Sequence, residues 1–193
     1  ASACNRSDGN FCISDLVFRK ILAACMVMRS KKGEEDMRRE KRVSDSSVET
    51  MHAVRPVHLN GAGRLFGGQL MEWLDEVAGL VGRRHAEHNI TTASVDNLRF
   101  IHGVYLDEVV VVIGKATYVG KTSMEVRVDT YVESKDGMRR PINRAYFTMV
   151  ALDEKDKPTE IPGLLIETEE EKWEWDAAKK RREMRMKRRE EGF

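Results

Sequence analysis

The spacing of apolar residues divides the middle of the chain into one helical segment and several strands. Between residues 67 and 88, apolar side chains recur with the period of an α-helix. When this segment is placed on a helix at about 100° per residue, they form one broad arc, which we expect to pack on a sheet. The arc consists of Leu70, Trp73, Leu74, Val77, Ala78, Leu80 and Val81.

Segments with the composition of β-strands lie on both sides of this helix. One runs from Val43 to Val57 and leads into a loop of turn residues, 58–63. The later segments are Thr91–Ile101, Val109–Val119, Ser123–Glu133 and Arg139–Leu152. Gly120-Lys121 and Asp136-Gly137 separate the last three strands as tight hairpin turns do, so these strands are predicted to form an antiparallel meander. The sequence therefore predicts an α+β fold, with one long helix wrapped by a five-stranded antiparallel sheet.

A highly charged segment, from Glu169 to Glu191, is predicted to form a C-terminal helix. It has 8 acidic and 9 basic residues, so its charges nearly cancel. The acids come first and the bases last, which suits the helix dipole and pairing between successive turns. We therefore expect a solvated helix rather than a contact with nucleic acid. The expected organisation is a tail at 1–42, a domain at 43–165 and this helix within 166–193.

Composition and charge narrow the class of protein further. The formal net charge is +1, so no overall basic field draws the chain to nucleic acid or to a membrane surface. All three cysteines lie within the first 25 residues, which excludes a disulfide framework in the body. The longest apolar run, Ile21–Met28, is far shorter than the roughly 20 residues of a membrane-spanning helix. We expect a cytoplasmic protein, with Met37 as one possible native start.

Opposite the apolar arc, the helix carries a narrow stripe in which Asp75 is the only aspartate. The stripe consists of Gly68, Met71, Glu72, Asp75, Gly79, Gly82 and Ala86. Each glycine inside a helix costs about 1 kcal/mol relative to alanine, so three on one face require a compensating reason. We infer that another subunit or a ligand approaches this stripe closely. The residues alone leave open that Asp75 is a polar residue on a wet face.

The run from His58 to Asp75 resembles the signature of the hotdog acyl-CoA thioesterases of the YciA-like and brain acyl-CoA hydrolase group. The positions that the signature fixes are held by Asn60, Gly63, Phe66, Gly67, Gly68 and Asp75. Residues 94–101 and 118–123 are similar to the second strand of that family and to its hairpin before the fourth strand. The resemblance covers about residues 43–165 and implies the hotdog fold and hydrolysis of acyl-CoA thioesters.

The resemblance also implies the roles of four residues. Asp75 would be the catalytic carboxylate, either as a general base on water or as a nucleophile. Asn60 would orient the water or the thioester carbonyl. Gly67 and Gly68 would present free N–H groups of the first helical turn to the oxyanion. In that family the asparagine and aspartate of one site belong to different units, which implies a homo-oligomer, at least a dimer and by expectation a trimer of dimers.

Four further residues are candidates for binding coenzyme A. Arg99, Lys121, Thr122 and Ser123 could contact its phosphates or pantetheine arm, or be ordinary strand-edge and turn residues. No cofactor is expected, and the histidine spacing does not favour a metal site.

Two other functions remain open from the sequence. A hotdog hydratase is disfavoured because no histidine lies on the Asp75 stripe. A catalytically idle assembly that binds acyl-CoA or a partner protein is the alternative function.

Overall fold

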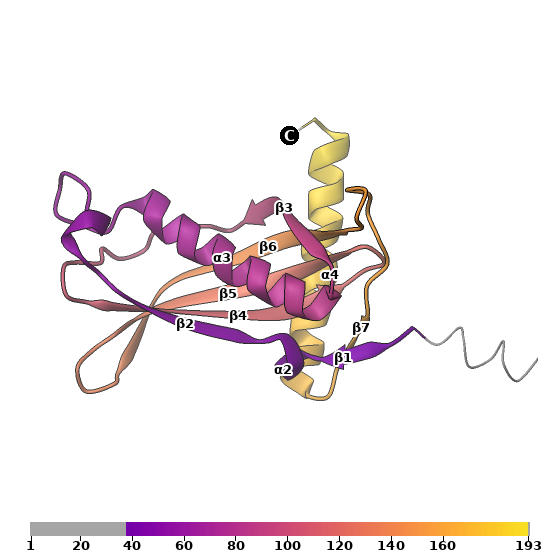
Figure 1. The fold of residues 1–193 in the computed structure, drawn as a ribbon, viewed down its shortest axis with the longest axis horizontal. Coiled ribbons are helices and arrows are strands. Elements are labelled where there is room, and N and C mark those ends of the chain that lie inside the picture. The colour runs from indigo at the N-terminus through magenta and orange to yellow at the C-terminus, as the bar shows by residue number, and fades with distance from the viewer. Residues whose placement is uncertain (1–37, 193) are drawn as a thin grey trace, which may run out of the picture. The chain divides into compact units, whose positions relative to one another are not determined.

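The computed structural model describes residues 38–192, and from Arg39 onward these form one compact unit. Its main element is a five-stranded antiparallel sheet with the strand order β2-β4-β5-β6-β3. The long helix α3 lies across one face of the sheet, called here the inner face, and helix α4 lies against the outer face (Figure 1). The predicted helix and five-stranded sheet are confirmed. Residues 1–37, most of the expected tail at 1–42, lie outside the described residues.

The central meander matches the prediction. Its strands have the predicted bounds: β4 is Val109–Val119, β5 is Ser123–Glu133 and β6 is Arg139–Leu152. The Gly120 N–H donates to the Ser123 carbonyl oxygen at 2.7 Å and closes the first turn. In the second turn, Gly137 has a left-handed φ of 81°, which favours glycine. Both predicted hairpins are therefore confirmed.

The two outer strands are shorter than predicted. The first, β2, is Val48–Ala53, because the short helix α2 (Val43–Ser46) and the 3-10 turn η1 (Pro56–His58) occupy the two ends of the predicted segment. The last strand of the sheet, β3, is Asn89–Asp96. It ends where Asn97, with a φ of 60°, turns the chain out of the sheet. Predicted strand residues 97–101 therefore lie in a loop.

Helix α3 (Gly67–Ala86) packs its apolar arc on the inner face and ends at Glu87, whose φ is 60°. The predicted helix extended to His88, which is two residues beyond the observed end at Ala86. The closest approach between helix and sheet is at Gly114 of β4, where a Cβ atom would lie 2.7 Å from the Val77 side chain. Glycine at this position therefore lets α3 lie directly on the strand.

The apolar face of α3 differs in part from the predicted arc. Leu80, expected to pack on the sheet, has 48% of its surface exposed. Gly82 and Ala86, expected on the opposite stripe, are buried. A Cβ atom on Gly82 would lie 3.2 Å from the Ile90 side chain. Because only two residues connect α3 to β3, this strand turns back against the end of the helix and covers it.

A two-stranded parallel sheet joins the start of the described chain to a later segment. The sequence did not predict this sheet. It pairs β1 (Glu40–Arg42) with β7 (Gly163–Leu165). Nearby, the ring of His85 is buried and lies 3.4 Å from Ser46 Oγ and 3.2 Å from the Pro162 carbonyl oxygen. Strands of three residues are too short to give a periodic signal.

Helix α4 (Glu169–Glu190) begins with a capping box. The Glu171 N–H donates to Thr168 Oγ1, and the Glu171 carboxylate accepts from the Thr168 N–H. The expectation of a solvated helix is wrong for one side of α4, because Glu174 and Ala178 are buried against the outer face. The charges of this side pair with the sheet, and Arg181 also pairs with Glu174 of α4 itself.

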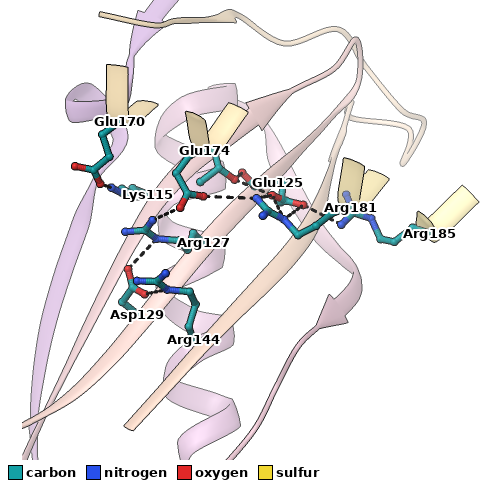
Figure 2. Close-up of polar contacts among 10 residues, drawn as sticks. Lys115, Glu125, Arg127, Asp129, Arg144, Glu170, Glu174, Arg181 and Arg185 are labelled. Carbon is teal, nitrogen blue, oxygen red and sulfur yellow. Dashed lines mark hydrogen bonds and ion pairs between the residues drawn. The ribbon is translucent and has the colours of Figure 1, made fainter. Parts of the chain in front are cut away.

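Buried ion pairs hold α4 on the outer face (Figure 2). Glu125 on β5 is 1% exposed and accepts hydrogen bonds from Arg181 at 2.7 Å and from Arg185 at 2.8 Å. In the opposite sense, Arg127 on β5 pairs with Glu174 on α4. Removing one partner of such a pair leaves a buried charge, at a cost of about 3–5 kcal/mol. Charge matching therefore fixes the position of α4 together with the packing of Trp175 on Tyr118 and of the buried Ala178.

Candidate active site

Asp75 lies near the middle of α3 with its side chain exposed. The hydroxyl of Thr92, on the edge strand β3, donates a hydrogen bond of 2.6 Å to Asp75 Oδ1. No cation pairs with this carboxylate among residues 38–192. An aspartate that is held by a neutral donor and open to solvent can act as a general base or as a nucleophile.

Asn60 lies in the loop before α3, and backbone hydrogen bonds fix its side chain. Its Oδ1 accepts from the N–H of Ala62 at 2.9 Å and from that of Arg64 at 3.2 Å. Its own N–H donates to the Arg64 carbonyl oxygen at 2.7 Å. Because Oδ1 is used in this way and Nδ2 has no acceptor in the described part of the chain, the side chain can offer a donor to a carbonyl or a water.

The first turn of α3 has free backbone donors. Its N-cap residue is Phe66, whose side chain makes no capping hydrogen bond. The N–H groups of Gly67 and Gly68 therefore have no side-chain acceptor from the N-cap, and the positive end of the helix dipole adds to their attraction for an anion. An oxyanion that develops on a thioester carbonyl is the kind of group that such donors stabilise.

Aromatic rings of the same chain lie beside both glycines. A Cβ atom on Gly68 would lie 2.4 Å from the Phe66 ring, and one on Gly67 would lie 3.4 Å from the Phe100 ring. In the described chain, the close approach inferred for Gly68 is therefore made by its own Phe66 ring. These contacts concern the position of a Cβ atom. They leave the backbone N–H groups of Gly67 and Gly68 as possible donors.

The first-turn donors and Asp75 are separated along the helix. Asp75 follows Gly67 by eight residues, which corresponds to about 12 Å at 1.5 Å per residue. A carbonyl held at the first-turn N–H groups is therefore out of reach of the carboxylate of the same chain. This geometry favours a site to which two subunits contribute.

The four candidate coenzyme A contacts fall in two places. Arg99 lies in the loop after β3, where its N–H donates to Asn143 Oδ1 at 3.3 Å. Lys121, Thr122 and Ser123 form the turn between β4 and β5 and the start of β5. The carbonyl oxygens of Lys121 and Thr122 accept backbone hydrogen bonds, so these two residues have structural roles in the turn. No hydrogen bond or ion pair joins Arg99 to this turn within residues 38–192.

Trp73 links α3 to the segments that lead to the Asn60 loop. The ring of His52 stacks on it with centroids 4.3 Å apart, and the ring of His58 meets it edge-on at 5.1 Å. Burial lowers the pKa of His52 below its ordinary value, and the nearby Glu76 opposes this shift. The three rings fix the path of the chain from β2 to the loop.

Sequence reasoning missed Thr92, whose hydroxyl holds Asp75. A threonine in a strand is an ordinary strand former, and only the pairing of β3 with β6 brings it beside the helix. The predicted residues Asn60, Gly67, Gly68 and Asp75 all lie on the loop before α3 or on α3 itself. Residues 38–192 contain no cluster of three His, Cys, Asp or Glu side chains that could hold a metal ion.

Comparison with known proteins agrees with this fold. Residues 62–138 match the model of the thioesterase superfamily. YkhA of Bacillus subtilis, which is named an uncharacterized acyl-CoA thioester hydrolase, is 35% identical over 128 residues, which are 66% of this chain and 74% of that protein. An acyl-CoA hydrolase of Staphylococcus aureus, solved with butyryl coenzyme A, is 33% identical, with a TM-score of 0.75 over 79% of this chain and 93% of that one. The chain belongs to the hotdog acyl-CoA thioester hydrolases.

Longer proteins also match. The cytosolic acyl coenzyme A thioester hydrolase of the rat is 36% identical over 154 residues, which are 78% of this chain. The chain spans only 40% of the length of that relative. No helix within residues 38–192 is both long and apolar enough to cross a membrane.

Proposed function

We propose that this chain hydrolyses acyl-CoA thioesters to a free fatty acid and coenzyme A, at a site shared between two subunits. The observation that carries the proposal is the exposed Asp75 carboxylate, held by Thr92 on a helix whose first turn has free N–H donors. Membership in the acyl-CoA thioester hydrolase family supports acyl-CoA as the substrate.

Solved variants of the Staphylococcus aureus enzyme support the choice of residues. Alanine replaces an asparagine, an aspartate or a threonine in three of its structures. In that chain the asparagine precedes the aspartate by 15 residues and the threonine follows it by 17. The same intervals separate Asn60, Asp75 and Thr92. We therefore assign Asp75 as the catalytic carboxylate, Asn60 as the group that orients the reactants, and Thr92 as a positioning residue.

The reaction follows from these groups. The thioester carbonyl accepts hydrogen bonds from the N–H groups of Gly67 and Gly68, which stabilise the negative charge that develops on its oxygen. Asp75 of the other subunit either removes a proton from the attacking water or attacks the carbonyl carbon itself. The C–S bond then breaks, and the thiolate of coenzyme A leaves and takes up a proton. In the second route, water hydrolyses the anhydride and restores Asp75.

A shared site requires at least a dimer, and we propose a trimer of dimers. An acyl-CoA thioesterase that is 34% identical to this chain, with a TM-score of 0.74, is described as hexameric. The separation of Asp75 from the first turn of α3 supports the sharing of the site. We propose a cytoplasmic location from the likeness to cytosolic relatives.

The direct test is release of free thiol. Purified protein is incubated with acyl-CoAs of different chain length in the presence of a thiol reagent, and Asp75→Asn serves as the matched variant. We expect steady thiol release that falls at least about 100-fold in the variant, the scale of a lost general base. Because Asp75 is exposed, the melting temperature of the variant stays close to that of the wild type. Equal turnover by both proteins would exclude Asp75 as the catalytic group.

A further inference from the structure

A pocket lies on the flank of α3 that faces away from Asp75. It has a volume of about 330 Å³ and is formed by the end of β2, by η1 with its N-cap residue, and by α3. Strand β2 is one edge of the five-stranded sheet, and β3, whose Thr92 contacts Asp75, is the other edge. The pocket is therefore separate from the candidate active-site carboxylate of the same chain. Its lining residues are Met51, His52, Ala53, Arg55, His58 and Trp73.

The hydrogen bonding of His58 determines which of its ring nitrogens carries the proton. Its Nδ1 accepts the backbone N–H of Arg55 at 3.2 Å, so the neutral ring carries its proton on Nε2. His58 is only 9% exposed, and Nε2 has no hydrogen-bond acceptor among residues 38–192. A donor that is largely shielded from water gains more from a bound acceptor than an exposed donor does. His58 therefore offers one N–H donor to the pocket.

Arg55, the N-cap residue of η1, adds a cation. Its side chain is exposed, and no carboxylate pairs with it within the described part of the chain. Burial lowers the pKa of His52 and Glu76 opposes this shift, so the acid on this flank of α3 acts on His52. A guanidinium presents its N–H groups in a planar fork that matches the two oxygens of a carboxylate. Arg55 and His58 together therefore suit an anionic group.

The remaining walls of the pocket suit an apolar body. Met51 is 54% exposed, and Ala53 is exposed as well. The ring of His52 is stacked on Trp73 with centroids 4.3 Å apart, which adds a flat surface. The volume of the pocket is at the lower end of the range for ligand pockets, about 300–1,000 Å³, so the ligand is small. A small carboxylate with an apolar body matches this lining.

We propose that this pocket binds a small carboxylate with an apolar body, and that Arg55 and His58 are the ligands of its carboxylate group. Met51, Ala53 and Trp73 contact the body of the ligand. Fatty acids of short and medium length belong to this class of compound, and the proposed hydrolysis releases such acids. The binding site itself does not rest on the proposed function, because binding can be measured without turnover.

The test measures the binding of octanoate by calorimetric titration at about pH 8, where imidazoles are ordinarily neutral. Arg55→Gln removes the guanidinium. His58→Asn keeps an oxygen that can accept the Arg55 N–H, and removes the Nε2 donor. The matched control is Arg83→Gln, which removes the same charge from an exposed arginine near the other end of α3. Circular dichroism and melting temperature establish that each protein is folded.

We expect octanoate to bind at least about tenfold more weakly to each of the two pocket variants, because each lacks one hydrogen bond to the carboxylate. Its affinity for Arg83→Gln should stay within about twofold of that of the wild type. Equal binding to the wild type and to Arg55→Gln would overturn the proposal. Because Arg55 is exposed, this variant provides the test even if His58→Asn does not fold.

Three further probes test the class of ligand. Acetate has the carboxylate without the apolar body and octanol has the body without the charge, so each should bind at least about tenfold more weakly than octanoate. Inorganic phosphate that binds as tightly as octanoate, and that Arg55→Gln no longer binds, would overturn the carboxylate assignment and show a site for inorganic anions.

Nuclear magnetic resonance of the imidazole nitrogens shows where octanoate binds. We expect the Nε2 signal of His58 to shift as octanoate is added and to stop shifting when the site is full. A signal that does not move while calorimetry detects binding would place the ligand elsewhere, including the candidate active site, and would overturn the proposal. A wild-type protein that does not bind octanoate would overturn it as well.

Discussion

Thr92 Oγ1 lies 2.6 Å from Asp75 Oδ1 and joins the edge strand β3 to the middle of helix α3. The bond fixes one orientation of a carboxylate that is otherwise exposed to solvent. A side chain on a surface helix normally samples several rotamers, so the threonine favours the one in which Asp75 Oδ1 accepts its hydrogen bond. This contact is the basis of the positioning role that we propose for Thr92.

We predict that Thr92→Val lowers kcat about tenfold, because it removes one hydrogen bond that orients Asp75. Thr92→Ser keeps the hydroxyl and should restore most of the rate, which a merely structural role for the side-chain volume would not explain. KM for the acyl-CoA should change little in either variant. Steady-state thiol release measures both constants, and wild-type kcat in Thr92→Val would contradict the positioning role.

The shared site can be tested by complementation. Asn60→Ala and Asp75→Asn proteins should each be nearly inactive, yet their mixed dimer has one site with both defects and one with neither. Random mixing makes about half of the dimers mixed, so about a quarter of wild-type activity should return. Co-expression with two different affinity tags isolates the mixed dimers, and these should show about half of wild-type activity because one of their two sites is intact. Mixed dimers as inactive as their parents would mean that both residues act within one subunit.

Gly79 tests whether a partner approaches the Asp75 stripe. A Cβ atom at Gly79 would meet nothing within 4 Å in its own chain, so Gly79→Leu should leave the subunit folded. Leucine is also the better helix former. We expect smaller particles by light scattering and a loss of thiol release.

Gly82 supplies the control for that experiment. Gly82→Leu should instead lower the melting temperature, because its side chain would press on Ile90 of the same chain. An unchanged particle size with full activity in Gly79→Leu would show that the stripe faces only water.

His52 gives a stability effect with a defined sign. Its pKa is lowered chiefly by burial against Trp73, so as the pH falls below 6.5 the unfolded chain binds the proton first. Stability is therefore full above pH 6.5 and is lost as the pH falls through the lower pKa of the folded state. Between about pH 7.5 and about pH 5.5, the melting temperature should fall by about 2 °C less in His52→Gln than in the wild type. Calorimetry measures this difference, and parallel pH profiles would contradict it.

The sequence predicted the meander correctly because each of its strands is long, rich in β-branched residues and bounded by turn residues. The outer strand β2 was overestimated because the predicted segment also took in α2 (Val-Ser-Asp-Ser) and the first two residues of η1, Pro56 and Val57, although Ser, Asp and Pro favour turns over strands. The face of α3 near Gly82 was assigned wrongly because helical periodicity does not show that β3 turns back over the end of the helix. Long-range contacts decide such positions.

The candidate site was only partly predictable for a related reason. Asn60, Gly67, Gly68 and Asp75 lie in one continuous run, so their pattern can be recognised in the sequence. Thr92 takes its proposed role from a contact between distant segments, β3 and α3. The sequence suggested that the acids of α4 pair with the bases of the same helix. In the structure, Glu174 and Arg181 pair with residues of β5.

The polar character of the outer face also bears on how the protein is made. The sheet precedes α4 in the chain, so during translation its outer face is complete before the helix that covers it has emerged from the ribosome. A bare apolar face would then be prone to aggregation. The face of β5 that α4 later covers carries Glu125, Arg127 and Asp129. Water solvates these side chains well until the arginines and Glu174 of α4 pair with them. Before α4 covers it, this face of the sheet is therefore less prone to aggregation than an apolar face would be.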